Sequence, residues 1–234
     1  MLEEILKSGF EELGITPDDK AITRYRVYYE RLSEVNKVMN LTAISGEDES
    51  ARLHFLDSAA IMTACDISGK KIIDVGTGAG FPGLALKIAQ PDITLTLLDS
   101  LDKRIGFLRE TCEKLGFDDV ECIHARAEEA GAEYRERYDL AVSRAVARLS
   151  LLSELCMPFV KVGGMFIAMK GPDCAEELDE AKHAISVLGG KLVRCENYTI
   201  PGSDVVHSLV IIKKERPTAA KYPRRWAQIK KQPL

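Results

Sequence analysis

The sequence lacks the features that mark membrane, secreted and metal-binding proteins. No apolar run approaches the roughly 18 residues of a membrane-spanning helix, and the first four residues, MLEE, do not resemble the basic start of a signal peptide. The six cysteines form no C-x-x-C pair, so we expect no disulfide framework. Cys122 and His124 share one face of a predicted strand, but no second pair follows at zinc spacing. We therefore expect a cytoplasmic protein without a metal site.

Composition excludes wholesale disorder, because 46% of the 234 residues are hydrophobic and 29% are charged. The length corresponds to one domain plus an appendage, taking roughly 150 residues per domain. Charge is uneven: residues 213–234 contain eight basic residues against Glu215 alone, a net +7 that leaves −11 for the rest of a chain of net charge −4. Two readings stay open for this segment, a phosphate-binding arm and a merely solubilising tail.

The first 66 residues are predicted to be helical. Apolar residues from Leu2 to Leu13 recur at helical spacing. A second helix is predicted to open at Thr16-Pro17-Asp18-Asp19, where a capping residue, a proline and two acids suit a helix start. A third helix is predicted over residues 48–63. These helices are expected to form a cap on a larger domain.

From Lys70 onward, short apolar runs alternate with helical stretches. Strands are predicted over residues 71–75, 93–98, 120–124, 139–143, 165–169, 191–198 and 207–213, and helices over residues 82–90, 102–115, 149–160 and 174–188. Such alternation predicts a Rossmann-like α/β fold with a mostly parallel seven-stranded sheet. The last two strands have no helix between them and suggest an antiparallel edge. The predicted division is a helical cap (1–66), an α/β domain (67–215) and a basic C-terminal arm (216–234).

A glycine-rich loop follows the first predicted strand. Its sequence, Asp74-Val75-Gly76-Thr77-Gly78-Ala79-Gly80, stands between a strand and a helix, as a nucleotide-binding loop does. Phe81 occupies the position where the dinucleotide fingerprint requires glycine. The acid before the first glycine suits S-adenosylmethionine, whose ammonium and sulfonium groups are cationic. We therefore predict that Asp74, Gly76, Gly78 and Gly80 bind this cofactor.

Asp99 ends the second predicted strand, where a carboxylate can accept hydrogen bonds from ribose hydroxyls. The alternative role is that of a cap for the helix over residues 102–115. An NAD-dependent oxidoreductase also stays open, whereas a P-loop is excluded because no Gly-Lys-Ser/Thr follows the glycines.

No general base is evident, and we assign none. The turn after the fourth strand, Ser143-Arg144-Ala145-Val146, is not the Asn/Asp-Pro-Pro-aromatic run typical of amine methylation. Cys112 and Cys156 have no activating partner, so we expect them in the core. A ring nitrogen with a free lone pair, such as N7 of guanine, needs no base, and positioning would suffice. Arg144 and Lys170 are placed to hold a phosphate or a base edge, or else to form surface ion pairs.

Nine motifs together resemble the RsmG (GidB) family, the bacterial guanine-N7 methyltransferases of small-subunit ribosomal RNA. They are the glycine loop with its Phe81-Pro82-Gly83 extension, Asn40-Leu41-Thr42, His54-x-x-Asp57-Ser58, Leu98-Asp99-Ser100, Lys103-Arg104 with Phe107-Leu108, Arg126-Ala127-Glu128, Ser143-Arg144-Ala145, Lys170-Gly171 and Lys221-Tyr222-Pro223-Arg224-Arg225.

The resemblance implies a class I S-adenosylmethionine-dependent methyltransferase fold and methylation of N7 of one guanosine in 16S rRNA of the small ribosomal subunit. It carries cofactor contacts onto Gly76, Phe81, Asp99, Ala127, Glu128 and Arg144, and it turns Lys170 and the basic tail toward RNA. The protein is expected to act as a monomer. The alternatives are a methyltransferase for another RNA or a small molecule, and a non-catalytic RNA-binding protein of ribosome assembly.

Three places depart from the family pattern, and one of them is Gly106, which interrupts a predicted helix. Ala125 stands where the family usually has glycine, in the loop expected to hold adenine. Trp226-Ala227-Gln228-Ile229 replaces a small stretch rich in glycine and proline. Trp226 can stack on a nucleic-acid base.

Overall fold

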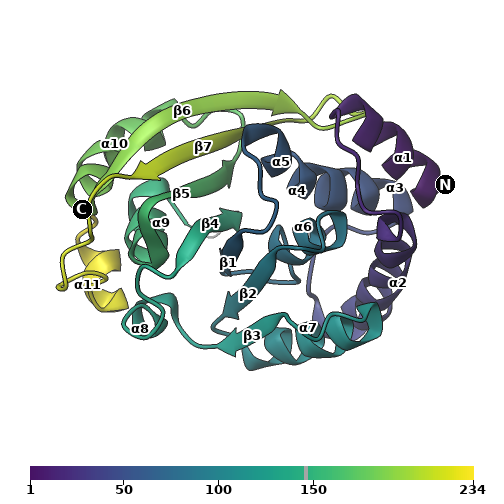
Figure 1. Cartoon of the computed structure of the whole chain (residues 1–234), viewed down its shortest axis with the longest axis horizontal. Helices are drawn as coiled ribbons and strands as arrows, with labels where there is room; N and C mark the ends of the chain where they lie inside the picture. Colours follow the sequence, from purple (N-terminus) through teal and green to yellow (C-terminus); the bar gives the residue numbers. More distant parts are fainter. Residues whose placement is uncertain (145–146) are drawn as a thin grey trace.

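A computed structural model describes residues 1–144 and 147–234. Seven strands form one sheet in the order β3-β2-β1-β4-β5-β7-β6 (Figure 1). Their bounds are β1 Lys71–Val75, β2 Thr94–Asp99, β3 Glu121–His124, β4 Tyr138–Arg144, β5 Val160–Lys170, β6 Gly190–Thr199 and β7 Val206–Lys214. Neighbouring strands pair in parallel except β7, which runs antiparallel to β5 and β6. The predicted mostly parallel sheet with an antiparallel edge is confirmed.

The strand order places a topological switch point beside β1. The chain moves outward from β1 to β2 and β3, then crosses to β4 on the other side of β1. In open α/β sheets, ligands bind beyond the carboxyl ends of the strands at such a point. Val75 ends β1, Asp99 ends β2 and Arg144 ends β4, so these three chain positions border the expected binding crevice.

Helices cover both faces of the sheet. α1 Leu2–Glu12, α2 Ala21–Met39, α6 Gly83–Ala89 and α7 Asp102–Leu115 lie on one face, and α9 Leu149–Cys156 and α10 Ala175–Val187 lie on the other. Successive residues of β1 point to opposite faces: Ile72 packs with the first group and Ile73 with the second. Phe10 and Tyr25 of the N-terminal helices share the core of Ile72, so hydrophobic packing is continuous across residue 66. The division at residues 66 and 215 stays a prediction.

The N-terminal helices differ from the predicted ones at two places. α2 begins at Ala21 instead of near Thr16, because the Asp18 carboxylate accepts the N–H of Lys20 at 3.0 Å and its carbonyl accepts that of Ala21, which closes a turn before the helix. The predicted helix over residues 48–63 is divided into α3 Glu47–Ser50, a π-helical turn Ala51–Leu56, α4 Asp57–Ala59 and α5 Ile61–Ala64. π-turns are frequent at functional sites, and this one carries His54. Among the described helices, none combines the length and the apolar character needed to cross a membrane.

The helix predicted over residues 149–160 ends early. α9 stops at Cys156, a 3-10 turn covers Met157–Phe159, and β5 begins at Val160. Pro158 explains the break, because proline has no N–H to continue the helical ladder. Two short helices, α8 Ala127–Ala130 and α11 Trp226–Lys231, were not predicted.

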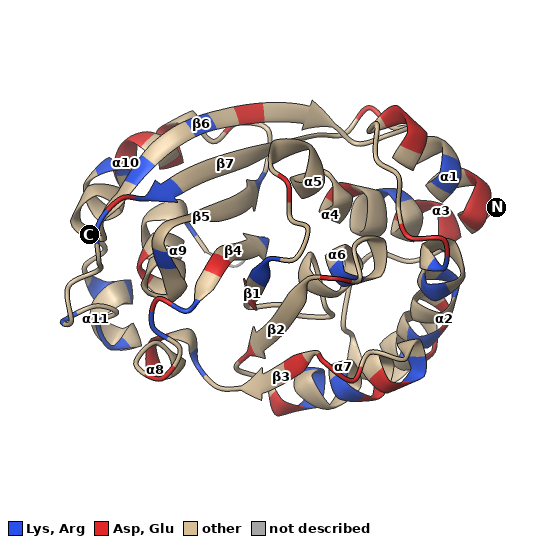
Figure 2. Cartoon of the chain, in the orientation of Figure 1, with Lys and Arg blue, Asp and Glu red and all other residues tan. Residues whose placement is uncertain are grey.

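The basic C-terminal segment is folded against the domain. Arg224 donates from its backbone N–H and from its guanidinium to Glu154 of α9 at 2.6–2.9 Å. Arg135 donates to backbone carbonyls of this segment, that of Tyr222 included, and Ile229 of α11 is fully buried. A buried Glu154 needs such a partner, which is why the segment is not a detached arm. Figure 2 shows basic residues on α11 and at the adjoining end of β7.

Candidate functional site

The loop between β1 and α6 carries the three glycines of the predicted motif. The Gly76 N–H donates to the Leu98 carbonyl at 2.8 Å, so the loop crosses the end of β2. Gly78 has a φ of +61°, which favours glycine, and an added Cβ would meet nothing within 4 Å, so bare main chain faces open space there. At Gly80 an added Cβ would lie 2.4 Å from the Tyr28 hydroxyl. This glycine therefore allows α2 to pack against the loop.

Asp74 lies beneath the loop. Its Oδ2 accepts hydrogen bonds from the Thr77 hydroxyl and from the Gly83 N–H, both at 2.7 Å. The side chain is fully buried, and burial raises its pKa to about 6 in spite of these hydrogen bonds. Oδ1 has no hydrogen-bond partner among the described residues. The structure therefore places Asp74 as the group that ties the glycine loop to the start of α6, and not at the cavity surface where a cationic ligand was expected to meet it.

Asp99 faces the crevice from the end of β2. Its Oδ2 accepts the N–H of Gly78 at 2.9 Å and lies 3.4 Å from Nη1 of Arg104, and its Oδ1 accepts the N–H of Leu101 at 2.9 Å. Leu101 is the residue before α7. The hydrogen bond from its N–H to Asp99 therefore orders the turn that leads into the helix, and it does not cap an N–H group within the helix. A carboxylate has about four acceptor sites. Asp99 thus holds the loop and retains capacity for hydroxyl donors.

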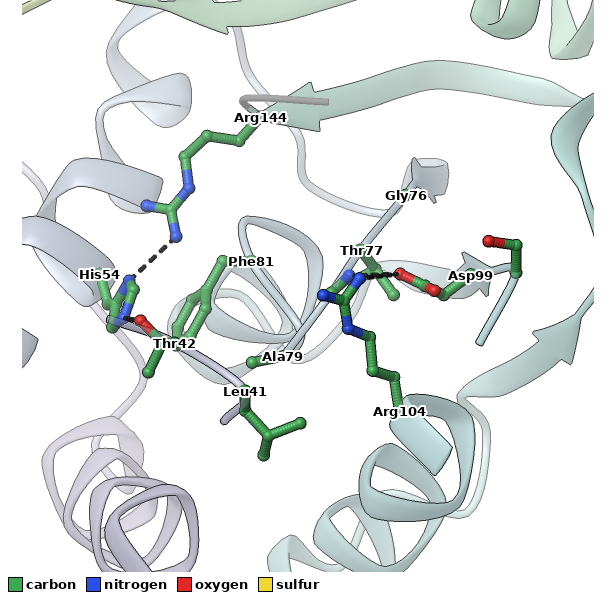
Figure 3. A pocket seen from close by; sticks show the side chains of 12 residues that line it. Leu41, Thr42, His54, Gly76, Thr77, Ala79, Phe81, Asp99, Arg104 and Arg144 are labelled. Carbon is green, nitrogen blue, oxygen red and sulfur yellow. Dashed lines mark hydrogen bonds and ion pairs between the residues drawn. The ribbon is translucent and has the colours of Figure 1, made fainter. Parts of the chain in front are cut away.

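A cavity of about 410 Å³ opens between these elements. Five of the predicted site residues line it: Gly76, Gly78, Phe81, Asp99 and Arg144. Figure 3 shows Arg144 and Arg104 on opposite sides of the cavity, with Phe81 and Ala79 between them. Asp74 and Gly80 are not among the lining residues.

A second cavity, of about 210 Å³, continues past Asp99 toward β3 and α8. Gly76 and Asp99 line both cavities, so the two form one crevice across the ends of β1, β2 and β3. Ala127 and Glu128 line the second cavity, on the side where the adenine loop was predicted, and so does Trp226 of α11. The sequence predicts only a nucleic-acid contact for Trp226, because nothing in it relates this residue to segments so far away in the chain.

Aromatic rings build the wall at the other end. The Phe81 ring stacks on His54 with centroids 4.2 Å apart and an interplanar angle of 7°. Tyr28 stacks beside Phe81 at 5.2 Å, and the guanidinium carbon of Arg144 lies 5.1 Å from the Phe81 ring centroid. Phe81 is only 5% exposed, so it serves as a packed platform that orients His54 and Arg144.

The carboxylate of Asp57 is the centre of a buried polar network. Its Oδ1 accepts from the Tyr198 hydroxyl at 2.6 Å and from Nδ1 of His207 at 2.8 Å, and its Oδ2 accepts from Nη1 of Arg144 at 2.8 Å. Burial alone would raise the pKa of Asp57, but the bond from His207, the charge of Arg144 and the bond from Tyr198 outweigh it and hold the pKa below its ordinary value. Asp57 therefore stays ionised and fixes Arg144.

His54 is held neutral in the same network. Nη2 of Arg144 donates to Nδ1 of His54 at 3.0 Å, so Nδ1 is the acceptor and Nε2 carries the proton. Nε2 lies 2.9 Å from the hydroxyl oxygen of Thr42 and donates to it (Figure 3). Burial and the positive charge of Arg144 lower the pKa of His54 to about 3. Only the pattern His54-x-x-Asp57, one helical turn apart, signals this network in the sequence, and nothing there adds Tyr198 or His207.

A third cavity, of about 680 Å³, lies on the far side of Arg144 and His54, which line both this cavity and the first one. Lys170 also lines it, but its side chain is only 8% exposed, and its Nζ lies 2.7 Å from the Glu177 carboxylate and 2.6 Å from the carbonyl of Ala147. Lys170 is thus part of an ion pair in the cavity wall. The Ala145-Val146 part of the predicted turn lies outside the described residues.

Two other expected features can be placed. Cys112 and Cys156 are buried, and burial raises the pKa of Cys156, so this thiol is not activated as a nucleophile. Within residues 1–144 and 147–234, no three His, Cys, Asp or Glu side chains are grouped in a way that could hold a metal ion.

Comparisons with known proteins identify the family. Residues 21–203 match the GidB family, described as rRNA small subunit methyltransferase G. The chain is 49% identical to ribosomal RNA small subunit methyltransferase G of Alkaliphilus metalliredigens over 98% of both chains. It is 46% identical to the protein of the same name from Acetivibrio thermocellus, over 100% of this chain and 97% of that relative. The chain belongs to the GidB family.

The solved structure of another protein has a similar fold. The structure of TYW2 from M. jannaschii in complex with AdoMet matches with a TM-score of 0.56 at 17% identity, over 69% of this chain and 76% of the other. The predicted class I S-adenosylmethionine-dependent methyltransferase fold is confirmed. An NAD-dependent oxidoreductase, which the glycine loop alone left open, does not agree with the family.

The described residues fit S-adenosylmethionine, the cofactor of this class. Gly78 offers bare main chain next to the first cavity, and Asp99 offers a carboxylate with acceptor capacity for a ribose. The second cavity has apolar walls from Val75, Leu98 and Leu155, as a purine ring requires. Along the crevice, the first cavity would hold the methionine part of the cofactor, the Asp99 carboxylate would bind the ribose, and the second cavity would hold the adenine.

Replacing Asp74 with asparagine should change how stability depends on pH. The folded pKa of about 6 lies above the ordinary value of 3.8, so between these values the folded protein keeps a proton that the unfolded chain has lost. Stability therefore falls as the pH rises from about 4 to 6, by as much as about 3 kcal/mol through this group. Asp74→Asn cannot ionise and should lack this fall.

Denaturant unfolding at several pH values measures the difference. Asp92→Asn, at an exposed carboxylate, serves as the control and should follow the wild-type pH dependence. If Asp74→Asn shows the same decrease between pH 4 and 6 as the wild type, Asp74 is not the buried acid described above.

Asp57 and Arg144 should be energetically coupled. Asp57→Asn leaves the buried Arg144 without its counter-charge and should lower the free energy of unfolding by about 3–5 kcal/mol. Adding Arg144→Met should recover part of this loss, because the double variant no longer buries an unpaired charge. Urea unfolding of the two single variants and the double variant gives the coupling free energy, which we expect to exceed about 1 kcal/mol.

The pair of Asp48 and Arg52, whose carboxylate is exposed, provides the control, and Asp48→Asn should cost less than about 1 kcal/mol. If the changes in the free energy of unfolding of the two single variants simply add in the double variant, Asp57 and Arg144 are not energetically coupled.

Proposed function

We propose that this protein transfers the methyl group of S-adenosylmethionine to N7 of a specific guanosine in 16S rRNA of the small ribosomal subunit. The observation that carries the proposal is the meeting of two cavities at Arg144 and His54. One cavity has the features of a cofactor site, and the other, of about 680 Å³, has room for a nucleoside. The relatives' name, ribosomal RNA small subunit methyltransferase G, supports the class of RNA.

The cofactor supplies an electrophilic methyl group on a sulfonium. In the transfer, the bond from sulfur to the methyl carbon breaks and the lone pair of N7 forms the new bond to carbon. The positive charge moves from the sulfonium to the purine, and no proton leaves the substrate. Such a reaction needs in-line positioning and no general base.

The residues at the junction agree with a reaction that needs no base. His54 is neutral, but its Nδ1 already accepts from Arg144. Asp57 is ionised, but it accepts three hydrogen bonds and is fully buried. Neither side chain is poised to take a proton from a substrate. We therefore assign them to positioning.

Arg144, which lines both the first and the third cavity, has N–H groups that are available to a ligand. A guanidinium has five N–H groups, and three of these donate to Leu53, Asp57 and His54. The other two have no partner among the described residues and can bond a cofactor carboxylate, a phosphate or the O6 of guanine. Lys170 lies in the wall of the third cavity, where the Glu177 carboxylate balances its charge.

The basic surface around α11 suits a phosphate backbone. Lys221, Arg225, Lys230 and Lys231 are exposed, while Arg224 of the same segment is held by Glu154 of α9. We propose that these side chains contact RNA, that the protein acts as a monomer in the cytoplasm, where its substrate is assembled, and that the transfer requires no metal ion.

Methyl transfer to unmodified small subunits tests the proposal directly. Purified protein and radiolabelled S-adenosylmethionine should label 16S rRNA at one guanosine, and mass spectrometry of nuclease fragments should place the methyl group on N7. Label on another base, on another RNA or on no RNA would contradict the proposed function.

Asp99→Ala should weaken cofactor binding, because the variant loses the carboxylate that accepts from ribose hydroxyls. Bonds to charged groups contribute about 1.5–3 kcal/mol, so the dissociation constant for S-adenosylhomocysteine should rise by at least about tenfold in calorimetry. Asp102→Ala, at an exposed carboxylate on the same turn, should bind as the wild type does. Unchanged affinity of Asp99→Ala would remove this residue from the ribose site.

A further inference from the structure

The C-terminal segment reaches the end of the cofactor crevice. Trp226, the first residue of α11, lines the cavity of about 210 Å³ together with Asp99, Ala127 and Glu128. Its half-buried indole packs against the hydrophobic core on the α9 side of the sheet, and Ala125 and Ala127 pack against the same core. Among the described residues that line this cavity, Trp226 is the only aromatic one.

We propose that Trp226 is a cofactor-binding residue whose indole forms one wall of the adenine subsite, so that the C-terminal segment completes the cofactor site. This inference rests on the proposed use of S-adenosylmethionine. An aromatic side chain beside a narrow apolar cavity suits a flat purine, because every nucleobase offers a π-face for stacking.

The position of Trp226 is fixed by contacts on both sides of it. Two residues before it, Arg224 makes three hydrogen bonds to Glu154 of α9, one of them from its backbone N–H. Three residues after it, Ile229 is fully buried against the same helical layer. Leu155, the neighbour of Glu154 in α9, lines the cavity itself. The anchor of the segment and a wall of the cavity are therefore adjacent residues of one helix.

An RNA base is the alternative partner for the indole, and the surroundings favour the cofactor. The cavity beside Trp226 is continuous with the ends of β1 and β2 through Gly76 and Asp99. The third cavity, which we assign to the substrate, lies at the opposite side of the first one, beyond Arg144. A nucleobase stacked on Trp226 would occupy the cofactor's crevice and not the substrate's.

Trp226 is the only tryptophan in the chain, so its fluorescence reports on this subsite alone. Titration of the full-length protein with S-adenosylhomocysteine should give a saturable change in tryptophan emission, with the dissociation constant that calorimetry gives. Adenosine should cause the same change, and methionine should not. Emission that stays constant while calorimetry shows binding would overturn the inference and leave the proposed function standing.

Variants at this position give the second readout. Trp226→Ala should raise the dissociation constant for S-adenosylhomocysteine by about 5- to 150-fold, whereas Trp226→Phe should stay within about threefold of the wild type because it keeps an aromatic face. Gln228→Ala, at an exposed residue of the same helix, is the matched control and should bind normally. Wild-type affinity of Trp226→Ala for the cofactor product, combined with weaker binding to small subunits, would assign the indole to RNA and refute the proposal.

Discussion

The carboxylate of Asp57 is fully buried at a point where four segments meet. Asp57 itself begins α4, and its three hydrogen-bond donors come from the end of β4, from β6 and from β7: Arg144, Tyr198 and His207. A buried charge is costly unless it is paired and hydrogen-bonded. The segments are therefore held in one arrangement, and the N-terminal helices become part of the site instead of a separate cover.

This arrangement explains how Arg144 keeps a fixed position between the first and third cavities, both of which it lines. The guanidinium is hydrogen-bonded to Asp57 and His54 and lies beside the Phe81 ring, so little conformational freedom remains to be lost when a ligand binds. On one side lies the crevice over the ends of β1, β2 and β3, and on the other lies the larger cavity. A reaction that depends on alignment and not on proton transfer needs a rigid wall of this kind.

The sequence predicted the strands and most of the crevice because both depend on local patterns. Apolar runs located all seven strands, and the glycine loop and Asp99 followed from their places at strand ends. The role of Asp74 could not be predicted, since it depends on where the Thr77 hydroxyl and the Gly83 N–H point after folding. The Asp57 network and the position of Trp226 were missed for a related reason: each joins residues that are distant in the chain. The break after α9 had a local signal, Pro158, that apolar periodicity outweighed.

The central claim is that one crevice over the ends of β1, β2 and β3 holds the whole cofactor, with its reactive end toward Arg144. A crystal structure of the protein with S-adenosylhomocysteine tests it most directly. The account predicts the ribose at the Asp99 carboxylate, the adenine between Ala127 and the Trp226 indole, and the sulfur on the Arg144 side of the glycine loop. A ligand bound with its adenine toward Arg144, or in the larger cavity, would contradict the account.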